Sequence, residues 1–244
     1  NLPLLQFSAI TGVFGLSFLI ALFNAALSQA LFHRTIAPYL ALPLVLLGSI
    51  HLWGLYRLDA MDNQTHPTLK VGIVQGNIPQ DRKWKVHRLT WTANHYAKLT
   101  RQLAAEDSPD LIIYPETALP LYFGHPFYAS YTDTIAALPP ELETPILVGS
   151  LKADYQDDHA SIYNRAFLLD TQGEVVDFAD KVHLVPFGEF LPFPSIFQYL
   201  EGLTAESGVF RHGERHKALT IPGSEISFGV FICYESIFPA ITRA

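Results

Sequence analysis

The sequence has 244 residues, a formal net charge of −7 and a composition that is 49% hydrophobic and 16% charged. The acidic balance argues against nucleic acid as a partner, because phosphate binding needs clustered lysine and arginine and the longest basic run covers only residues 82–85. The single cysteine, Cys233, leaves no internal disulfide to identify a compartment and argues against a cysteine-based zinc site.

The first part of the chain is almost uncharged. Arg34 is the only charged side chain in residues 1–56, and residues 2–32 and 35–56 form two uncharged runs. A helix that spans a bilayer requires about 20 apolar residues, so each run is long enough to cross a membrane. We therefore predict two transmembrane helices within residues 1–56.

Polar residues and flanking charge indicate how these helices are placed in a membrane. Gln6, Asn24 and Gln29 lie within the first run, and polar side chains inside a bilayer normally face other helices. We therefore expect further spans before Asn1, and the chain, which lacks an initial methionine, is expected to be a fragment of a longer protein. Arg34 between the two runs favours a cytoplasmic loop, so the domain that follows is expected on the opposite side.

The sequence pattern changes after the second apolar run. Residues 57–68 are polar and are interpreted as a linker, and residues 69–244 as a globular domain truncated at its C-terminus. The domain is predicted to open with a buried strand, an amphipathic helix and a second buried strand at residues 69–75, 85–105 and 110–114. Further strands are expected at residues 146–151, 161–170, 175–177, 218–221 and 226–233, with a short helix near residues 128–137. This order predicts a layered α/β domain.

Three side chains with reactive groups stand out in the predicted domain. Glu116 follows the second predicted strand, and Cys233 ends the last one. Cys233 is therefore expected at the carboxyl edge of the sheet, where ligands bind in open α/β folds. Taken singly, Glu116, Lys181 and Cys233 have ordinary explanations as a loop carboxylate, a surface lysine and an inert buried thiol. Together they supply a base for the thiol proton, a cation for the thiolate and oxyanion, and a nucleophile.

Four segments of the domain carry a family resemblance. The strings YPETA around Glu116, DKVHLVPFGEFLPF around Lys181 and GVFICYES around Cys233, after the opening VGIVQGNIPQ, resemble the motifs of the nitrilase or carbon-nitrogen hydrolase superfamily. Within it, the two preceding spans and the string PFGEFLPF are similar to the apolipoprotein N-acyltransferase family. The resemblance covers essentially the whole chain. It implies a nitrilase-like αββα sandwich preceded by transmembrane α-helices.

The resemblance also implies roles for individual residues. Glu116 is expected to be the general base, Lys181 the oxyanion-stabilising cation and Cys233 the nucleophile. The other matching positions are the supporting residues Glu189, Tyr234 and Glu235 and the substrate-binding residues Trp84, Phe187, Phe190 and Phe193. For Trp84, Tyr234 and Glu235 a packing role fits the sequence equally well. The aromatic segment at residues 185–210 either forms an apolar entrance for acyl chains or fills the core.

The family's activity implies a substrate class and a location. The expected acyl donor is a membrane phospholipid, and the acceptor is the N-terminal diacylglyceryl-cysteine of a bacterial apolipoprotein. The reaction is expected to be ping-pong, through a thioester on Cys233, without a metal or other cofactor. The parent protein is expected in the bacterial inner membrane as a multi-pass protein with its catalytic domain on the periplasmic side.

Two other functions remain open at this point. A membrane-tethered amidase or nitrilase would use the same three residues on a small amide or nitrile, with water as the second nucleophile. A catalytically inactive relative would serve as a membrane scaffold. A papain-like protease is disfavoured, because the sequence around Cys233 lacks the glycine-cysteine pattern of that family and none of the ten histidines emerges as its partner.

Overall fold

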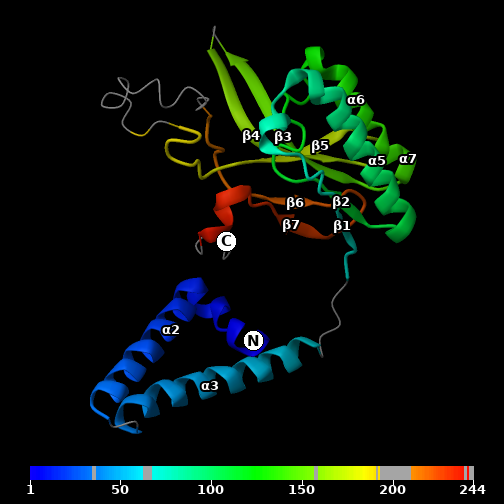
Figure 1. Cartoon of the computed structure of the whole chain (residues 1–244). Helices are drawn as coiled ribbons and strands as arrows, with labels where there is room; N and C mark the ends of the chain where they lie inside the picture. Colours follow the sequence, from blue (N-terminus) through cyan, green and yellow to red (C-terminus); the bar gives the residue numbers. More distant parts are fainter. Residues whose placement is uncertain are drawn as a thin grey trace. The chain divides into compact units, whose positions relative to one another are not determined.

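The computed structural model describes residues 1–34, 37–62, 68–156, 159–190, 192, 210–238 and 241. The chain forms two compact units, residues 1–68 and residues 69–244. Figure 1 shows the first unit as helices and the second as strands accompanied by helices. All of the acidic residues except Asp59 and Asp62 belong to the second unit.

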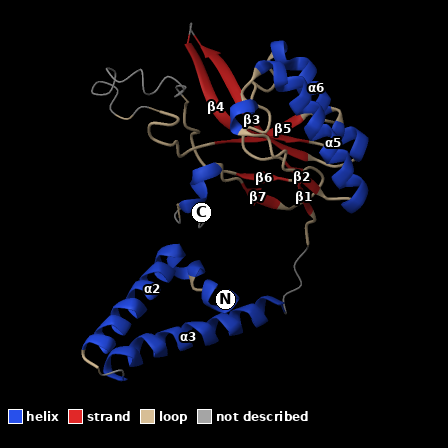
Figure 2. Cartoon of the chain, viewed as in Figure 1, coloured by secondary structure: helices blue, strands red, loops and turns tan. Residues whose placement is uncertain are grey.

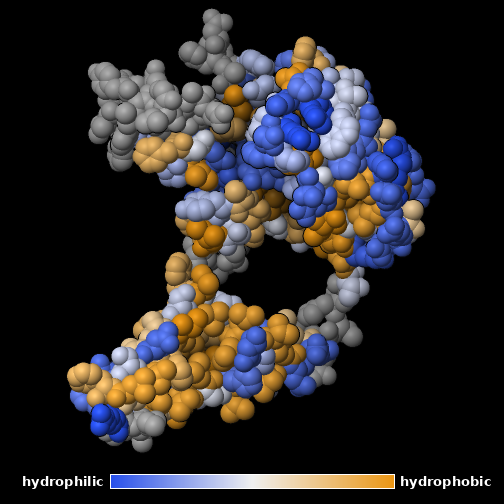
Figure 3. All heavy atoms as spheres, viewed as in Figure 1, coloured by the Kyte–Doolittle hydropathy of each residue, from blue (hydrophilic) through white to orange (hydrophobic). Residues whose placement is uncertain are grey.

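The first unit consists of helices with largely apolar surfaces. Its elements are α1 (Leu2–Leu5), α2 (Ser8–Phe32) and α3 (Ala37–Asp62). Gly12 interrupts α2 with a φ of 66°, a left-handed conformation that glycine adopts at little cost. Figure 3 shows hydrophobic side chains over most of the visible surface of α2 and α3. By length and composition, α2 and α3 are each able to cross a membrane.

Two predicted boundaries in this unit need correction. The first apolar run, residues 2–32, is divided between α1 and α2. Residues 57–62, which were predicted to belong to the linker, continue α3. Their sequence, RLDAMD, contains neither glycine nor proline and includes several good helix formers, so nothing in it ends the helix at Tyr56.

A five-stranded mixed sheet forms the centre of the second unit. Its strands run in the order β1 (Val71–Ile73), β2 (Leu111–Ile113), β3 (Ile146–Gln156), β4 (His159–Leu169) and β5 (Val175–Asp180). The first three strands are parallel, and β4 and β5 each pair antiparallel with the strand before them. The predicted strand-helix-strand opening is confirmed, because β1 and β2 are parallel neighbours joined through a helix. The end of β5 fixes the position of Lys181.

A helical layer covers one face of this sheet (Figure 2). It contains α5 (Leu89–Asp107), α6 (Ala129–Ala136) and α7 (Leu138–Leu142), and shorter turns precede them at α4 (Gln80–Lys83), η1 (Val86–Arg88) and η2 (Pro126–Tyr128). The helix predicted from residue 85 begins as η1 and becomes α-helical at Leu89. The buried side chains Leu89, Ala93, Tyr96 and Thr100 recur every three or four residues, so one stripe of α5 faces the sheet.

The sheet is buried on both faces. In β2, Leu111 belongs to one hydrophobic cluster and Ile112 to another, because successive side chains of a strand point to opposite faces. The cluster with Ile112 includes Tyr96 of α5 and so joins the sheet to the helices. The cluster with Leu111 includes Leu219 and joins the sheet to a second, smaller layer. Burial of both faces explains why the central strands are continuously apolar.

The second layer carries the cysteine. It is a two-stranded antiparallel sheet of β6 (Ala218–Thr220) and β7 (Ser227–Gly229), followed by the 3-10 helix η4 (Cys233–Ile237). The strand predicted at residues 226–233 is therefore shorter than expected, and Cys233 begins a helical turn instead of ending a strand. Cys233 has a φ of 58°, a left-handed conformation that a strand cannot accommodate.

Candidate active site

Glu116 lies on a tight turn directly after β2. The turn closes through a 3.1 Å hydrogen bond from the Ala118 N–H to the Pro115 carbonyl, and Thr117 has a left-handed φ of 45°. It rests on β3 at Gly149, where a Cβ atom would lie only 2.2 Å from the Pro115 carbonyl oxygen. Only glycine allows this close approach, so β3 helps to set the position of the Glu116 carboxylate.

Two neighbours that the sequence did not reveal hold Glu116 in place. Asn164 on β4 is 3% exposed, and its amide donates a 2.6 Å hydrogen bond to Glu116 Oε1. Lys83, at the end of α4, donates to the Glu116 carbonyl at 3.2 Å and to the Thr117 hydroxyl at 2.7 Å. Burial lowers the pKa of Lys83, and the charge of Glu116 opposes this effect. The sequence gives no signal that singles out Asn164, because β4 also contains the polar residues His159, Ser161 and Arg165.

Lys181 follows β5 and is buried beside two carboxylates. Its side chain is 1% exposed, and Nζ lies 3.3 Å from Glu116 Oε1 and 2.6 Å from Glu189 Oε1. Burial alone would lower the pKa of Lys181, but the hydrogen bond to Glu189 and the charges of both carboxylates raise it above its usual value. The group is therefore an ammonium ion at neutral pH and can serve as a fixed positive charge.

Glu189 is held by the segment that follows Lys181. While Oε1 accepts from Lys181, Oε2 accepts a 2.9 Å hydrogen bond from the Val185 N–H, and the Glu189 N–H donates to the Val185 carbonyl at 2.9 Å. Phe187 completes this tight turn with a φ of 62° and donates its N–H to the Phe190 carbonyl at 2.8 Å. The arrangement fixes the direction in which the Lys181 ammonium points.

Cys233 is exposed, and the charges of Glu116 and Lys181 both act on its thiol. Partial burial of the sulfur, the charge of Glu116 and hydrogen bonding to Glu116 raise the pKa of Cys233, while the charge of Lys181 and the Tyr234 N–H oppose the shift. The net effect keeps the group as a neutral thiol at neutral pH. Because the Glu116 carboxylate is near enough to shift the pKa of the thiol, it is a candidate to remove that proton when a substrate arrives.

Glu235 connects the cysteine segment to the lysine segment. Its side chain is fully buried; Oε1 accepts from the Val182 and His183 N–H groups at 2.8 and 3.0 Å, and Oε2 accepts from the Ile232 N–H at 2.8 Å. The residues after Lys181 and the residue before Cys233 are thus tied to one carboxylate. The sequence resemblance singled out Glu235, but not the backbone groups that it binds.

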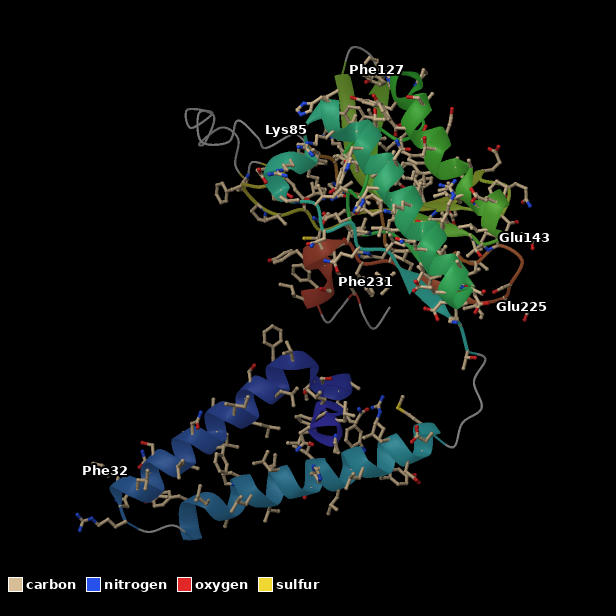
Figure 4. All side chains as sticks on the ribbon, turned by 45° about the vertical axis from the view of Figure 1, so that its right-hand side comes forward. Phe32, Lys85, Phe127, Glu143, Glu225 and Phe231 are labelled. Atoms are coloured by element: carbon tan, nitrogen blue, oxygen red, sulfur yellow. The ribbon has the colours of Figure 1, made fainter. Side chains whose placement is uncertain are left out.

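The expected substrate-binding aromatics are mostly exposed. Trp84 follows Lys83, whose Nζ lies 5.9 Å from the indole centroid, and Phe187 is exposed on the Glu189 turn. Tyr234, which was expected as a supporting residue, follows the cysteine and packs edge-on against Phe238, with ring centroids 5.2 Å apart. Phe190 is partly buried, and Phe193 lies outside the described residues, as does most of the segment at residues 185–210. Figure 4 labels Phe231, which precedes η4 and was not singled out by the sequence.

Comparison with known proteins relates this chain to one family. The family model for carbon-nitrogen hydrolase matches residues 70–244. The apolipoprotein N-acyltransferase of Geobacter metallireducens is 39% identical over 252 residues, which cover 100% of this chain and 47% of that protein. The apolipoprotein N-acyltransferase of Brucella suis is 35% identical over 253 residues, with 97% and 45% covered. The chain therefore spans about half the length of these curated relatives.

Among solved structures, the carbon-nitrogen hydrolase from Helicobacter pylori G27 matches 72% of this chain and 55% of its own length. Its TM-score is 0.49 and its sequence identity is 14%. A similarity of this size carries no argument about the reaction.

Proposed function

Because the chain belongs to the carbon-nitrogen hydrolase family, we propose that it forms part of a membrane enzyme that N-acylates bacterial lipoproteins. The proposed reaction moves a fatty acyl group from a membrane phospholipid to the N-terminal diacylglyceryl-cysteine of an apolipoprotein. The observation that carries the proposal is the convergence on Glu116, whose carboxylate lies 3.3 Å from Lys181 Nζ and whose charge acts on the Cys233 thiol. The names and identities of the relatives support the choice of substrate.

The first half-reaction transfers the acyl group to sulfur. Glu116 removes the proton from the Cys233 thiol, and the thiolate attacks the carbonyl carbon of a phospholipid ester. Lys181 and nearby backbone N–H groups stabilise the tetrahedral oxyanion. When the intermediate collapses, the ester C–O bond breaks and Glu116 returns the proton to the departing alcohol. A lysophospholipid leaves, and a thioester on Cys233 remains.

The second half-reaction transfers the acyl group to nitrogen. The α-amine of the lipoprotein's diacylglyceryl-cysteine attacks the thioester carbonyl and loses a proton to Glu116. The C–S bond then breaks, an amide is formed, and the Cys233 sulfur takes the proton from Glu116 to become a thiol again, which restores the carboxylate. Glu189 acts through Lys181, because its 2.6 Å contact keeps the ammonium directed at the site in both halves.

The apolar parts of the chain support a lipid substrate. The helices α2 and α3 are long and apolar enough to hold the protein in a membrane. Exposed aromatic side chains at Trp84, Phe187 and Tyr234 belong to the segments that carry the site residues and offer apolar surface for acyl chains. We assign the protein to the bacterial inner membrane as a multi-pass protein, with the catalytic unit on the periplasmic side because Arg34 favours a cytoplasmic loop.

Intact-mass analysis of the full protein in phospholipid vesicles tests the first half-reaction. A long-chain acyl adduct should form on the wild-type protein and be absent from Cys233→Ala. Replacing the vesicles with a small aliphatic amide separates the alternatives. Hydrolysis of the amide without an acyl adduct would favour a tethered amidase, and inactivity in both assays would favour a scaffold.

A further inference from the structure

Three metal-ligating side chains meet beside the proposed active site. His183 follows β5, His216 precedes β6 and Glu235 belongs to η4, so three segments that are distant in the sequence converge. The proposed acyl transfer uses neither histidine. Glu235 contributes through its bonds to the backbone, and its proximity to two imidazoles is not explained by that role.

The distances between the three groups are close to those of a metal site. His216 Nε2 lies 3.4 Å from His183 Nδ1 and 3.8 Å from Glu235 Oε1, and His183 Nδ1 lies 3.9 Å from the same oxygen. Ligand atoms held about 2.0–2.2 Å from a tetrahedral zinc ion lie about 3.3–3.6 Å from one another. Small side-chain rotations that bring the two imidazoles toward Glu235 would therefore complete three corners of a tetrahedron.

Burial of Glu235 gives a second, independent reason to expect a cation. Its side chain is fully buried, and among the described residues its ion-pair partners are the two imidazoles alone. Buried carboxylates are normally paired with a cation or coordinate a metal, because removing a charge from water is costly. The three backbone N–H donors reduce this cost but supply no full positive charge.

We propose that His183, His216 and Glu235 bind a divalent transition-metal ion of the zinc class. Two imidazole nitrogens and one carboxylate oxygen suit Zn²⁺ better than Mg²⁺ or Ca²⁺, which prefer oxygen ligands. Glu235 Oε1, the oxygen nearest the imidazoles, already accepts hydrogen bonds from two backbone N–H groups. A bound metal would replace the longer of the two, the 3.0 Å bond from the His183 N–H. A fourth position remains for water or another ligand.

The surroundings hold the ligands and leave an entry path. The His183 ring stacks on Phe238 with centroids 4.8 Å apart, which keeps the imidazole near its present orientation and leaves only small rotations to complete the site. The His183 and His216 side chains are 42% and 23% exposed, so an ion can reach them from solvent. A bound ion would cross-link the segments after Lys181 and Cys233. This proposal does not depend on the acyl-transfer reaction.

Equilibrium dialysis of the full-length protein tests the site. The protein is purified in detergent without a histidine tag, stripped with a chelator and dialysed against ZnCl₂. We expect about one Zn²⁺ per chain and a higher unfolding temperature with zinc than without it. His183→Ala and His216→Ala should each weaken binding by more than the ~10–100-fold that loss of an outer partner costs. His87→Ala, which removes an exposed histidine from η1, should bind like the wild type.

Two further measurements keep the test decisive. Cys233→Ala should retain zinc binding, and Co²⁺ bound to the wild-type protein should show tetrahedral absorption without a thiolate band, because sulfur is not a ligand. If the histidine variants fail to fold, the wild-type data decide alone. Less than one bound Zn²⁺, no shift in unfolding temperature, or loss of binding in Cys233→Ala would overturn the proposal.

Discussion

The lysine side and the cysteine side of the candidate active site differ in how firmly the protein holds them. The Lys181 side chain is 1% exposed, with carboxylates 2.6 and 3.3 Å from Nζ. Cys233 is exposed and opens a short 3-10 helix. A charge that stabilises an oxyanion works best when it is fixed in advance, whereas a nucleophile that serves two substrates must stay accessible. The difference indicates a preorganised electrostatic centre beside an open thiol.

The largest expected effect comes from removing the fixed charge. Lys181→Met should slow acylation of Cys233 at least ~10²–10³-fold, the loss seen when one oxyanion donor is removed. The rate is measured as the growth of the acyl adduct by intact mass. Lys152→Met is the matched control, because Lys152 belongs to a more exposed pair with Asp154 at 3.4 Å. Near wild-type acylation in Lys181→Met would contradict a preorganised centre.

A smaller effect is expected from the residue that orients the base. Asn164→Ala removes a partly buried 2.6 Å hydrogen bond to the Glu116 carboxylate. A hydrogen bond to a charged group contributes about 1.5–3 kcal/mol, so acylation should slow roughly 10–100-fold. Single-turnover acylation measures this, with iodoacetamide labelling of Cys233 as a check that the thiol remains accessible. An unchanged acylation rate, equal to that of the exposed Asn94→Ala control, would show that Asn164 does not orient the base.

Replacing Glu116 should have opposite effects on two reactions of Cys233, labelling by iodoacetamide and acylation by phospholipid. The charge of Glu116 and its hydrogen bond raise the pKa of Cys233, so Glu116→Gln should lower that pKa and increase the thiolate fraction at neutral pH. Iodoacetamide labelling, measured with a chelator present, should become faster, because the thiolate is the reactive form. Acylation by phospholipid should nevertheless slow, because no carboxylate is left to remove the thiol proton. Slower labelling would mean that Glu116 does not hold the thiol neutral.

The smallest effect is expected from the exposed aromatic surface. Phe187→Ala should change the free energy of unfolding by no more than about 0.5 kcal/mol, as is usual for surface substitutions. Acylation from long-chain phospholipids should fall a few-fold more than acylation from short-chain esters, because only long chains can use the lost surface. Thermal unfolding and parallel acylation assays check both points. Equal losses with both esters would assign Phe187 to turn structure alone.

Local sequence patterns predicted much of the fold. Continuous apolar runs predicted β2, which begins at Leu111, and the start of β3 at Ile146. These runs are apolar because the strands are buried on both faces. The amphipathic pattern gave α5, although its first turn at Val86–Arg88 is a 3-10 helix. The motif resemblance predicted Glu116 and Lys181 as site residues, and in the structure Glu116 Oε1 lies 3.3 Å from Lys181 Nζ.

Features that depend on distant parts of the chain could not be predicted. Asn164 contacts Glu116 because β4 pairs with β3 and β5, a pairing that no local pattern specifies. The left-handed conformation of Cys233 is set by the turn into η4, and the sequence there reads as a continuing strand. His183 and His216 meet only after β5 and β6 are placed, so their proximity to Glu235 is invisible in the sequence.

A chase experiment on the thioester tests the central claim most directly. Wild-type protein is first acylated in vesicles, then freed of donor lipid and mixed with a peptide that carries an N-terminal diacylglyceryl-cysteine. We predict that the acyl mass disappears from Cys233 as an equal amount of N-acylated peptide appears, and that an N-acetylated peptide leaves the adduct in place. An adduct that decays to free fatty acid at the same rate with either peptide would contradict acyl transfer through Cys233.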